Sequence, residues 1–174
     1  DFLTRDSTGA AWLYSARGNG QFAGPPLAVG TGWEAFDLLI PTGDATGDGF
    51  ADVAARDSAG MLWLYPGDGR GGWLPRRLAG NGWSSMLSVF SPGDFTGDGK
   101  PDLIARQNNG VLWLYSGAGS GTWAEPIQIG TGWAQMTALF GPGDMNGDGN
   151  PDVLARHSSG ALLLYTGNGS GGWR

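Results

Sequence analysis

A unit of about 50 residues recurs along this chain, and it constrains the fold more than any other feature. One motif reads GDATGDGFADVAAR, GDFTGDGKPDLIAR and GDMNGDGNPDVLAR, starting at Gly43, Gly93 and Gly143. A second motif ends in Leu-Tyr and recurs as GAAWLY, GMLWLY, GVLWLY and GALLLY. A third, Gly-x-Gly-Trp, closes each unit. Repetition of this kind is typical of one supersecondary unit used several times, here about three and a half times.

Each unit is predicted to contain four short strands separated by glycine-rich turns. In one copy these strands cover residues 87–91, 102–106, 111–115 and 126–129. The third strand is apolar on both of its alternating faces, which indicates that both faces are covered. Four-stranded sheets stacked around an axis provide such cover. A β-sandwich and a solenoid are the alternatives.

We therefore predict an all-β fold, a β-propeller of four-stranded blades, over residues 1–174 as a single domain. The unit divides it into a partial blade at 1–33, blades at 34–83 and 84–133, and a partial blade at 134–174. Both partial blades are expected to have three strands, so two copies do not tile into seven complete blades. The remaining blades come either from a longer parent chain or from partner copies, and the sequence leaves both open.

The repeated loop has the pattern Asp-x-[Thr/Asn]-Gly-Asp-Gly-x-x-Asp. Oxygen-bearing side chains at positions 1, 3, 5 and 9, with a backbone carbonyl at position 7, can converge on a hard cation, and glycine at position 6 allows the sharp turn. An all-oxygen ligand set favours Ca²⁺ over transition metals. The candidate ligands are Asp44, Thr46, Asp48, Phe50 and Asp52; Asp94, Thr96, Asp98, Lys100 and Asp102; and Asp144, Asn146, Asp148, Asn150 and Asp152.

These loops are predicted to bind up to three Ca²⁺ ions, most tightly in the third loop, where Asn146 replaces threonine. They are not EF-hand loops, because position 12 is alanine instead of a bidentate glutamate. The alternative is a set of ion-free Asp-Gly turns. Three carboxylates within nine residues would then repel one another without compensation.

The loop, the strand after it and the 50-residue blade resemble FG-GAP/VCBS repeats, which are similar to the calcium-bearing blades of integrin α-subunits and certain lectins. The resemblance implies an extracellular, usually seven-bladed propeller with calcium in the hairpins between the first and second strands of a blade. Position 3 is more often Asn or Asp in that family, so Thr46 and Thr96 depart from its pattern. Low lysine with abundant alanine, glycine and arginine suggests a bacterial source, and we expect a secreted protein.

The charge distribution excludes several partners. The formal net charge is −6, and nine of the 16 acidic residues lie in the three loops, so three divalent cations would neutralise the chain. Nucleic-acid binding requires a basic surface, which this composition does not supply. No apolar run is long enough for a membrane span, so no membrane insertion is expected.

The inventory for catalysis is poor, and we predict that the chain is not an enzyme. There is no cysteine, and the sole histidine, His157, occupies a turn position held by Asp6, Asp57 and Gln107 in the other copies. The Gly-x-Gly-x-x-Gly runs starting at Gly67 and Gly167 precede no helix, which argues against nucleotide binding. A propeller-borne hydrolase or lyase would need an acid–base pair outside the loops.

Repeated arginine and tryptophan residues complete the pattern. The recurrent arginines Arg5, Arg56, Arg106 and Arg156 are expected to stack on an aromatic ring or to pair with a loop carboxylate. The tryptophans of the Trp-Leu-Tyr motif are assigned to the core. Two further sets lie beside polar turns and are candidate ligand-binding residues: Trp33, Trp83 and Trp133, and Trp73, Trp123 and Trp173.

Aromatic rings at such positions can stack on the apolar face of a sugar, although the same rings can instead seal the gaps between blades. The sequence thus favours a calcium-binding recognition module, lectin-like and glycan-binding, or the targeting domain of a secreted protein. The alternative is an integrin-like scaffold that binds a cell-surface protein.

Overall fold

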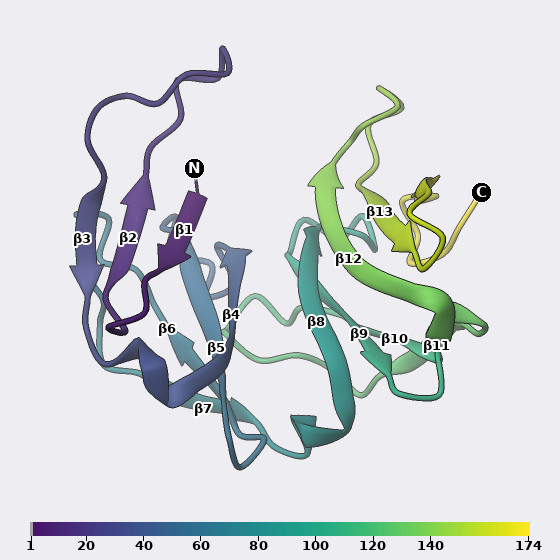
Figure 1. Ribbon diagram of the computed structural model, residues 1–174, viewed down its shortest axis with the longest axis horizontal. Helices are drawn as coiled ribbons and strands as arrows, with labels where there is room; N and C mark the ends of the chain where they lie inside the picture. The colour runs from purple at the N-terminus through teal and green to yellow at the C-terminus, as the bar shows by residue number, and fades with distance from the viewer. Residues whose placement is uncertain (1) are drawn as a thin grey trace.

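The computed structural model describes residues 2–174, in which four antiparallel sheets stand around an arc (Figure 1). Two complete four-stranded sheets lie in the middle, and a three-stranded sheet lies at each end. We call these sheets blades 1 to 4 in chain order. The prediction of an all-β chain built from propeller blades is confirmed, and so are the three strands in each end blade.

The strands of each blade follow one another in sequence and in space. Blade 1 contains β1 (Phe2–Arg5), β2 (Ala11–Tyr14) and β3 (Leu27–Gly30). Blade 2 contains β4 (Phe36–Gly43), β5 (Asp52–Asp57), β6 (Leu62–Tyr65) and β7 (Arg77–Gly80). Blade 3 contains β8 (Met86–Gly93), β9 (Asp102–Gln107), β10 (Leu112–Tyr115) and β11 (Ile127–Gly130). Blade 4 contains β12 (Met136–Gly143), β13 (Asp152–His157) and β14 (Leu162–Tyr165). Short 3-10 turns lead into blades 2, 3 and 4: η1 (Trp33–Ala35), η2 (Trp83–Ser85) and η3 (Trp133–Gln135).

The first strand of a blade is longer than the sequence indicated. We expected residues 87–91, whereas β8 has eight residues and ends at Gly93. The strand begins one residue earlier, at Met86, and a register shift after Phe90 places Gly93 opposite Asp102 at its end. The long strands β4, β8 and β12 lie side by side along the arc.

Most of the apolar core lies between blades. Leu62 and Leu64 of β6 have no exposed surface and pack against Leu103 and Ala105 of blade 3. Leu112 and its neighbours in β10 pack in the same way against blade 4. Burial between neighbouring blades therefore explains why the third strand of each unit is apolar on both faces.

Three of the recurrent arginines, Arg5, Arg56 and Arg106, join consecutive blades, but through other partners than expected. Arg56 Nη1 donates to the carbonyl oxygens of Trp83 at 2.9 Å and Met86 at 2.5 Å, and its guanidinium also binds Asp37. Arg106 donates to the corresponding two carbonyls in the following blade. The predicted aromatic or loop-carboxylate partners were thus wrong for these residues, because the guanidinium reaches two backbone carbonyl oxygens at the crossing between blades.

Helical structure in residues 2–174 is limited to short turns. No helix in this part of the chain is long and apolar enough to cross a membrane.

Candidate functional site

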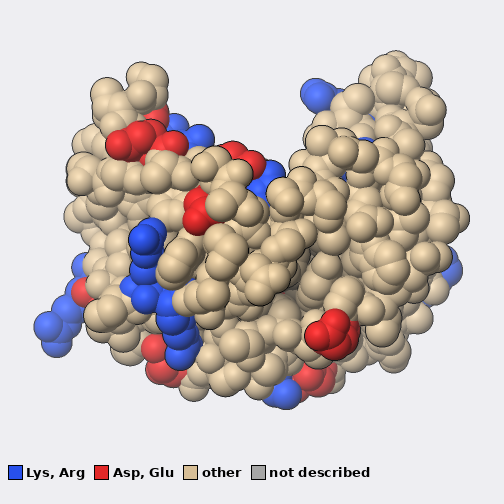
Figure 2. All heavy atoms as spheres, turned by 90° about the horizontal axis from the view of Figure 1, so that it is seen from below, with Lys and Arg blue, Asp and Glu red and all other residues tan. Residues whose placement is uncertain are grey.

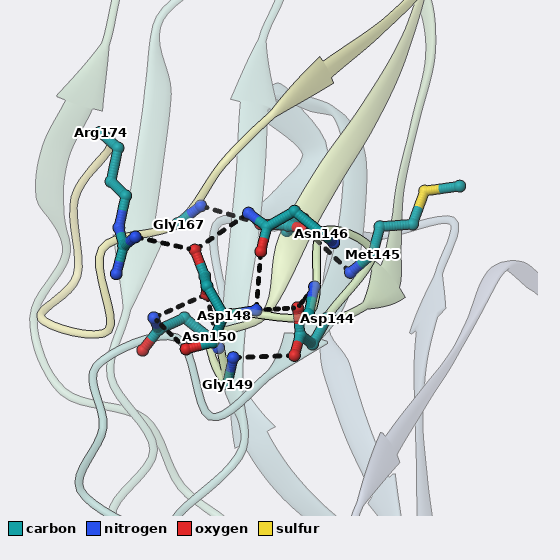
Figure 3. Close-up of polar contacts among 10 residues, drawn as sticks. Asp144, Met145, Asn146, Asp148, Gly149, Asn150, Gly167 and Arg174 are labelled. Atoms are coloured by element: carbon teal, nitrogen blue, oxygen red, sulfur yellow. Dashed lines mark hydrogen bonds and ion pairs between the residues drawn. The ribbon is translucent and has the colours of Figure 1, made fainter.

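The three aspartate-rich loops join the first and second strands of blades 2, 3 and 4, and their first aspartate organises each loop. Asp144 accepts hydrogen bonds from the backbone N–H groups of Gly147 at 2.7 Å, Asp148 at 3.1 Å and Gly149 at 2.8 Å (Figure 3). Asp44 and Asp94 accept the equivalent bonds in their loops. Position 1 therefore folds the loop around a carboxylate.

The aspartate at position 9 is buried and connects the loop to a second hairpin of its own blade. Asp102 is fully buried; its Oδ2 accepts from the N–H groups of Phe95 and Thr96, and its Oδ1 accepts from Gly117 N at 2.8 Å. Asp152 makes the three equivalent bonds, and Asp52 accepts from the N–H groups of Thr46 and Gly67. The glycine donor was missed by the sequence reasoning, although a glycine two residues after each Leu-Tyr of blades 2 to 4 was the available signal.

In the third loop, the side chains at positions 3, 5 and 9 lie close together. Asn146 Nδ2 is 2.9 Å from Asp148 Oδ2 and 3.5 Å from Asp152 Oδ1, while Arg174 reaches Asp148 at 3.1 Å (Figure 3). Burial raises the pKa of Asp148, but hydrogen bonds from Asn150 and Asn146 together with the charge of Arg174 outweigh it and lower the pKa. This carboxylate is therefore held in its ionised form.

The second loop contains polar groups that lack a positive partner. Burial raises the pKa of Asp102, although backbone N–H groups and the nearby Thr96 hydroxyl lower it in part. The hydroxyl oxygen of Thr96 is itself buried and takes part in no hydrogen bond of good geometry. A buried carboxylate beside an unsatisfied oxygen suits a hard cation in its donor chemistry. The Lys100 side chain does not contact Asp102 or Thr96; its Nζ lies 3.4 Å from Asp98 Oδ2.

The arrangement differs from a complete ligand cage. Within residues 2–174, no group of three or more acidic or histidine side chains is placed to hold a metal ion. The carboxylates at positions 1 and 9 are turned onto backbone N–H groups instead, as described above. Calcium binding by the loops therefore stays a prediction, supported by donor chemistry.

The loop at residues 44–52 lies between two depressions in the surface. One is a cavity of about 350 Å³ between blades 1 and 2, which we call the blade 1–2 cavity; its lining includes Leu13, Phe50, Asp52, Asp68 and Trp73. The other is a groove of about 530 Å³ between blades 2 and 3, which we call the blade 2–3 groove; its lining includes Thr46, Asp48, Leu74, Arg77 and Ser120. Both volumes fall in the range of small-molecule sites.

The blade 1–2 cavity combines aromatic and acidic side chains. Phe50 was predicted only as a backbone ligand, yet its side chain is 46% exposed and lines this cavity. Asp68 was not predicted at all; backbone N–H groups of Arg70 and Gly72 lower its pKa and keep it charged. Its Asp-x-x-x-Gly spacing to Gly72 was the signal available in the sequence.

The first set of candidate ligand-binding tryptophans is buried. Trp33, Trp83 and Trp133 are 3%, 5% and 6% exposed. Their rings lie 4.6, 4.5 and 4.2 Å from the rings of the tyrosines that end the third strand of the next blade, Tyr65, Tyr115 and Tyr165. A sugar-stacking role does not fit this placement, because the rings already fill the junction between blades.

The second set is partly buried at the same junctions. The indole N–H groups of Trp73 and Trp173 donate to the carbonyl oxygens of Val29 and Ile129 in the preceding blade. Trp123 packs against the core cluster between blades 2 and 3. The alternative of sealing the gaps thus accounts for their contacts, and Trp73 in addition lines the blade 1–2 cavity.

The remaining surface observations concern charge and the histidine. On the face drawn in Figure 2, basic side chains form one short column and a few small spots, some of them beside acidic side chains, and most of the surface is uncharged. His157 Nδ1 lies 2.8 Å from the Ser159 hydroxyl in a turn. Nothing in this arrangement places the histidine beside either depression.

Comparison with known proteins identifies the family of the repeat and solved structures with a similar fold. Residues 44–105 and 94–155 match the family described as FG-GAP-like repeat. A search of curated proteins gives no match. Among solved structures, the chain is similar to a lectin from Agrocybe aegerita, described by its specific recognition of non-reducing terminal N-acetylglucosamine, with a TM-score of 0.61 and 22% identity.

Two further structures extend the likeness. The BP39L lectin from Burkholderia pseudomallei has a TM-score of 0.61 and 18% identity, and the Photorhabdus luminescens Tc holotoxin pore has a TM-score of 0.58 and 18% identity. The matches cover 95%, 99% and 93% of this chain but 45%, 49% and 8% of the Agrocybe lectin, the BP39L lectin and the toxin chain. The chain thus spans less than half the length of the two lectins.

Proposed function

This chain belongs to the FG-GAP-like repeat family, and on that basis we propose that it is a non-catalytic, secreted recognition module that binds carbohydrate in a calcium-dependent manner. The observation that carries the proposal is the position of the loop at residues 44–52. Its residues line both the blade 1–2 cavity and the blade 2–3 groove, so an ion that orders this loop also shapes both depressions.

The lining of the cavity suits a sugar ring. Phe50 and Trp73 offer aromatic surface against which the C–H face of a pyranose can pack. The Asp68 carboxylate accepts hydrogen bonds, and sugar hydroxyl groups can donate them. Two of the structural neighbours are lectins, which supports carbohydrate as the ligand class, although at these identities the likeness shows the fold alone.

Glycan binding is tested on an array with the chain at 1 mM CaCl₂ and again in EDTA. We expect binding that Phe50→Ala weakens at least tenfold, because this exposed ring lines the cavity without supporting the core. Leu87→Ala is the matched control, since Leu87 is 55% exposed and lies outside the lining. The proposal is contradicted if the array shows no glycan binding in calcium. It is also contradicted if Phe50→Ala and Leu87→Ala lose binding to the same extent.

Calcium binding is tested by calorimetric titration and by thermal unfolding. Metal that binds only the folded loops raises the melting temperature by mass action, and EDTA reverses the increase. The third loop, with Asn146 at position 3, is expected to bind most tightly, so Asp144→Ala removes the strongest site. An unchanged melting curve with and without calcium would leave the loops as ion-free turns.

The protein-interaction scaffold is the second candidate. Exposed apolar side chains on the end blades, including Phe2 at 62% and Leu162 at 60%, are the observation in its favour. Affinity capture of a protein that free sugars do not displace would favour it over the lectin proposal.

A further inference from the structure

The blade 2–3 groove is lined by an arginine that the repeat does not require. Arg77 of β7 pairs with Leu64 in the sheet of blade 2. The same register position is held by Leu27 in blade 1 and by Ile127 in blade 3. The strand pairing thus forms equally well with an apolar side chain, and the charge of Arg77 is a feature of this one groove.

The charge of Arg77 is available to an anion from solution. Within residues 2–174, the exposed Arg77 side chain takes part in no hydrogen bond or ion pair. The adjacent Arg76 differs, because its guanidinium lies 4.4 Å from the centre of the Trp63 ring and donates to the Tyr65 hydroxyl at 3.0 Å. The fold therefore uses Arg76 and leaves Arg77 without an acceptor.

The guanidinium of Arg77 is positioned by the next blade. A Cβ on Gly121 would lie 2.5 Å from Arg77 Nη2 and 3.0 Å from its Cζ, so the guanidinium lies directly over this hairpin of blade 3. Gly121 N donates to the Ala45 carbonyl oxygen at 2.7 Å, which fixes the same hairpin against the loop at residues 44–52. The walls of the groove are therefore in place before a ligand binds, and this lowers the cost of binding.

The loop at residues 44–52 supplies a second polar group to the groove. Asp48 lines it, although no ion pair in the described part of the chain joins Asp48 to Arg77. The corresponding aspartates of the next two loops are paired with Lys100 and Arg174. Ser120 adds a hydroxyl group to the lining. The groove thus offers a cation together with groups that bind hydroxyls, and its ligand should carry an anion and several hydroxyl groups.

We propose that the blade 2–3 groove binds an acidic sugar and that Arg77 selects it by its carboxylate. This inference rests on the carbohydrate function proposed above and specifies the class of sugar. The planar guanidinium offers two parallel N–H groups to the two oxygens of a carboxylate. Ring hydroxyls donate to Asp48 and form hydrogen bonds with Ser120. A groove of about 530 Å³ is large enough for such a ligand.

The test compares two acidic sugars with their neutral parents: the methyl glycosides of glucuronic and galacturonic acid, and those of glucose and galactose. Each is titrated into the ¹⁵N-labelled chain in calcium, and its Kd is read from the amide signals of Gly119 and Ser120 and from the Nε–H signal of Arg77. We expect one acidic sugar to bind about tenfold more tightly than its parent, because it adds a charged hydrogen bond.

Arg77→Gln should abolish this preference. Arg17→Gln is the matched control, since Arg17 is an exposed arginine in a hairpin of blade 1 and its loss changes the net charge equally. This control should keep the preference, and circular dichroism shows whether both variants are folded.

Equal affinities for the acidic and neutral sugars overturn the inference, and so does a preference that survives Arg77→Gln. Tighter binding of glucose 6-sulfate than of either acidic sugar overturns the assignment to a carboxylate. A chain that binds neutral glycans on the array without preferring an acidic sugar contradicts this inference alone. A chain that binds no glycan in either experiment contradicts the proposed function as well.

Discussion

Single aspartate side chains shape the turns of this protein by accepting hydrogen bonds from groups a few residues ahead. Asp6 is a clear case: its carboxylate accepts from the Thr8 hydroxyl at 2.7 Å, from Thr8 N at 2.9 Å and from the Trp12 indole at 3.0 Å. These bonds favour the ionised form and lower the pKa of Asp6 from 3.8 to about 2, with the Thr8 hydroxyl as the largest cause.

A prediction for the pH dependence follows from this residue. Because the folded-state pKa is lowered, the stabilisation by Asp6 is complete above the unfolded value of 3.8 and is lost as the pH falls through about 2. Thr8→Ala should raise the Asp6 pKa toward 3.8 in a carboxyl NMR titration. Ser7→Ala, one position away, should leave it unchanged, and an equal pKa in all three proteins would contradict the assignment.

At the scale of the strands and turns, the crossing between blades depends on one buried cation. Arg106 is 4% exposed and donates to the carbonyls of Trp133 and Met136 at the entry to blade 4. Desolvation lowers the pKa of this guanidinium, which still remains charged. Arg156 stands at the same position of blade 4 but is exposed and contacts Thr137.

These two arginines form a natural matched pair for mutagenesis. Arg106→Met leaves two buried carbonyl groups without their charged donor and is expected to lower the free energy of unfolding by about 3 kcal/mol. Arg156→Met should change it by about 0.5 kcal/mol or less, as for other exposed positions. Urea unfolding measures both; equal effects would show that the crossing does not depend on the buried guanidinium.

The contact between a loop and the next blade can be tested with two glycines of one loop. Gly47 and Gly49 both have positive φ, at 78° and 89°. A Cβ on Gly47 would lie 2.8 Å from the Gly119 carbonyl oxygen, whereas one on Gly49 meets no atom within 4 Å. Both alanine variants have the free-energy cost of a left-handed backbone conformation. The difference in stability between them therefore reports the contact between the new Cβ at position 47 and the Gly119 carbonyl oxygen. We expect Gly47→Ala to be less stable than Gly49→Ala by about 1 kcal/mol in urea unfolding, and equal stabilities would exclude the contact.

The elements were largely predictable because the repeat aligns turn residues with strand ends. The expected strand at 102–106 is β9, which extends one residue further to Gln107. The partners of Arg56 were not predictable, since periodicity shows that a residue recurs but not that backbone carbonyls of the next blade lie within its reach. For the tryptophans of the Gly-x-Gly-Trp motif, the sequence left a ligand-binding role and a gap-sealing role open. The turn-rich surroundings do not show that the chain carries each ring inward against a tyrosine of the next blade.

For the candidate site, the sequence located the loops but not the hydrogen bonds that satisfy their carboxylates. The bond from Gly117 N to Asp102 joins residues 15 apart, and only the folded hairpin brings them together. The two depressions beside residues 44–52 depend on packing between blades, which no local pattern encodes.

At the scale of the whole molecule, stability is unevenly distributed because the middle junctions are complete and the ends are open. Ile104 and Leu112 in blade 3 have no exposed surface, whereas the leucines of β14 are 36% to 60% exposed. Regions with few buried contacts open more readily than the core.

Hydrogen exchange should therefore be slowest in β9 and β10 and fastest in β1 and β14. Mass spectrometry of peptic fragments resolves these strands. Uniform exchange across the four blades would contradict the uneven distribution.

The indole-to-carbonyl bond that Trp73 makes to blade 1, and Trp173 to blade 3, has a consequence for how such a chain can lengthen. The junction between blades 1 and 2 and the junction between blades 3 and 4 use the same groups, so a duplicated gene segment encoding residues 34–83, which includes Trp73, would find compatible surfaces on either side of its insertion point. Growth by copying whole units therefore requires no new interface to arise.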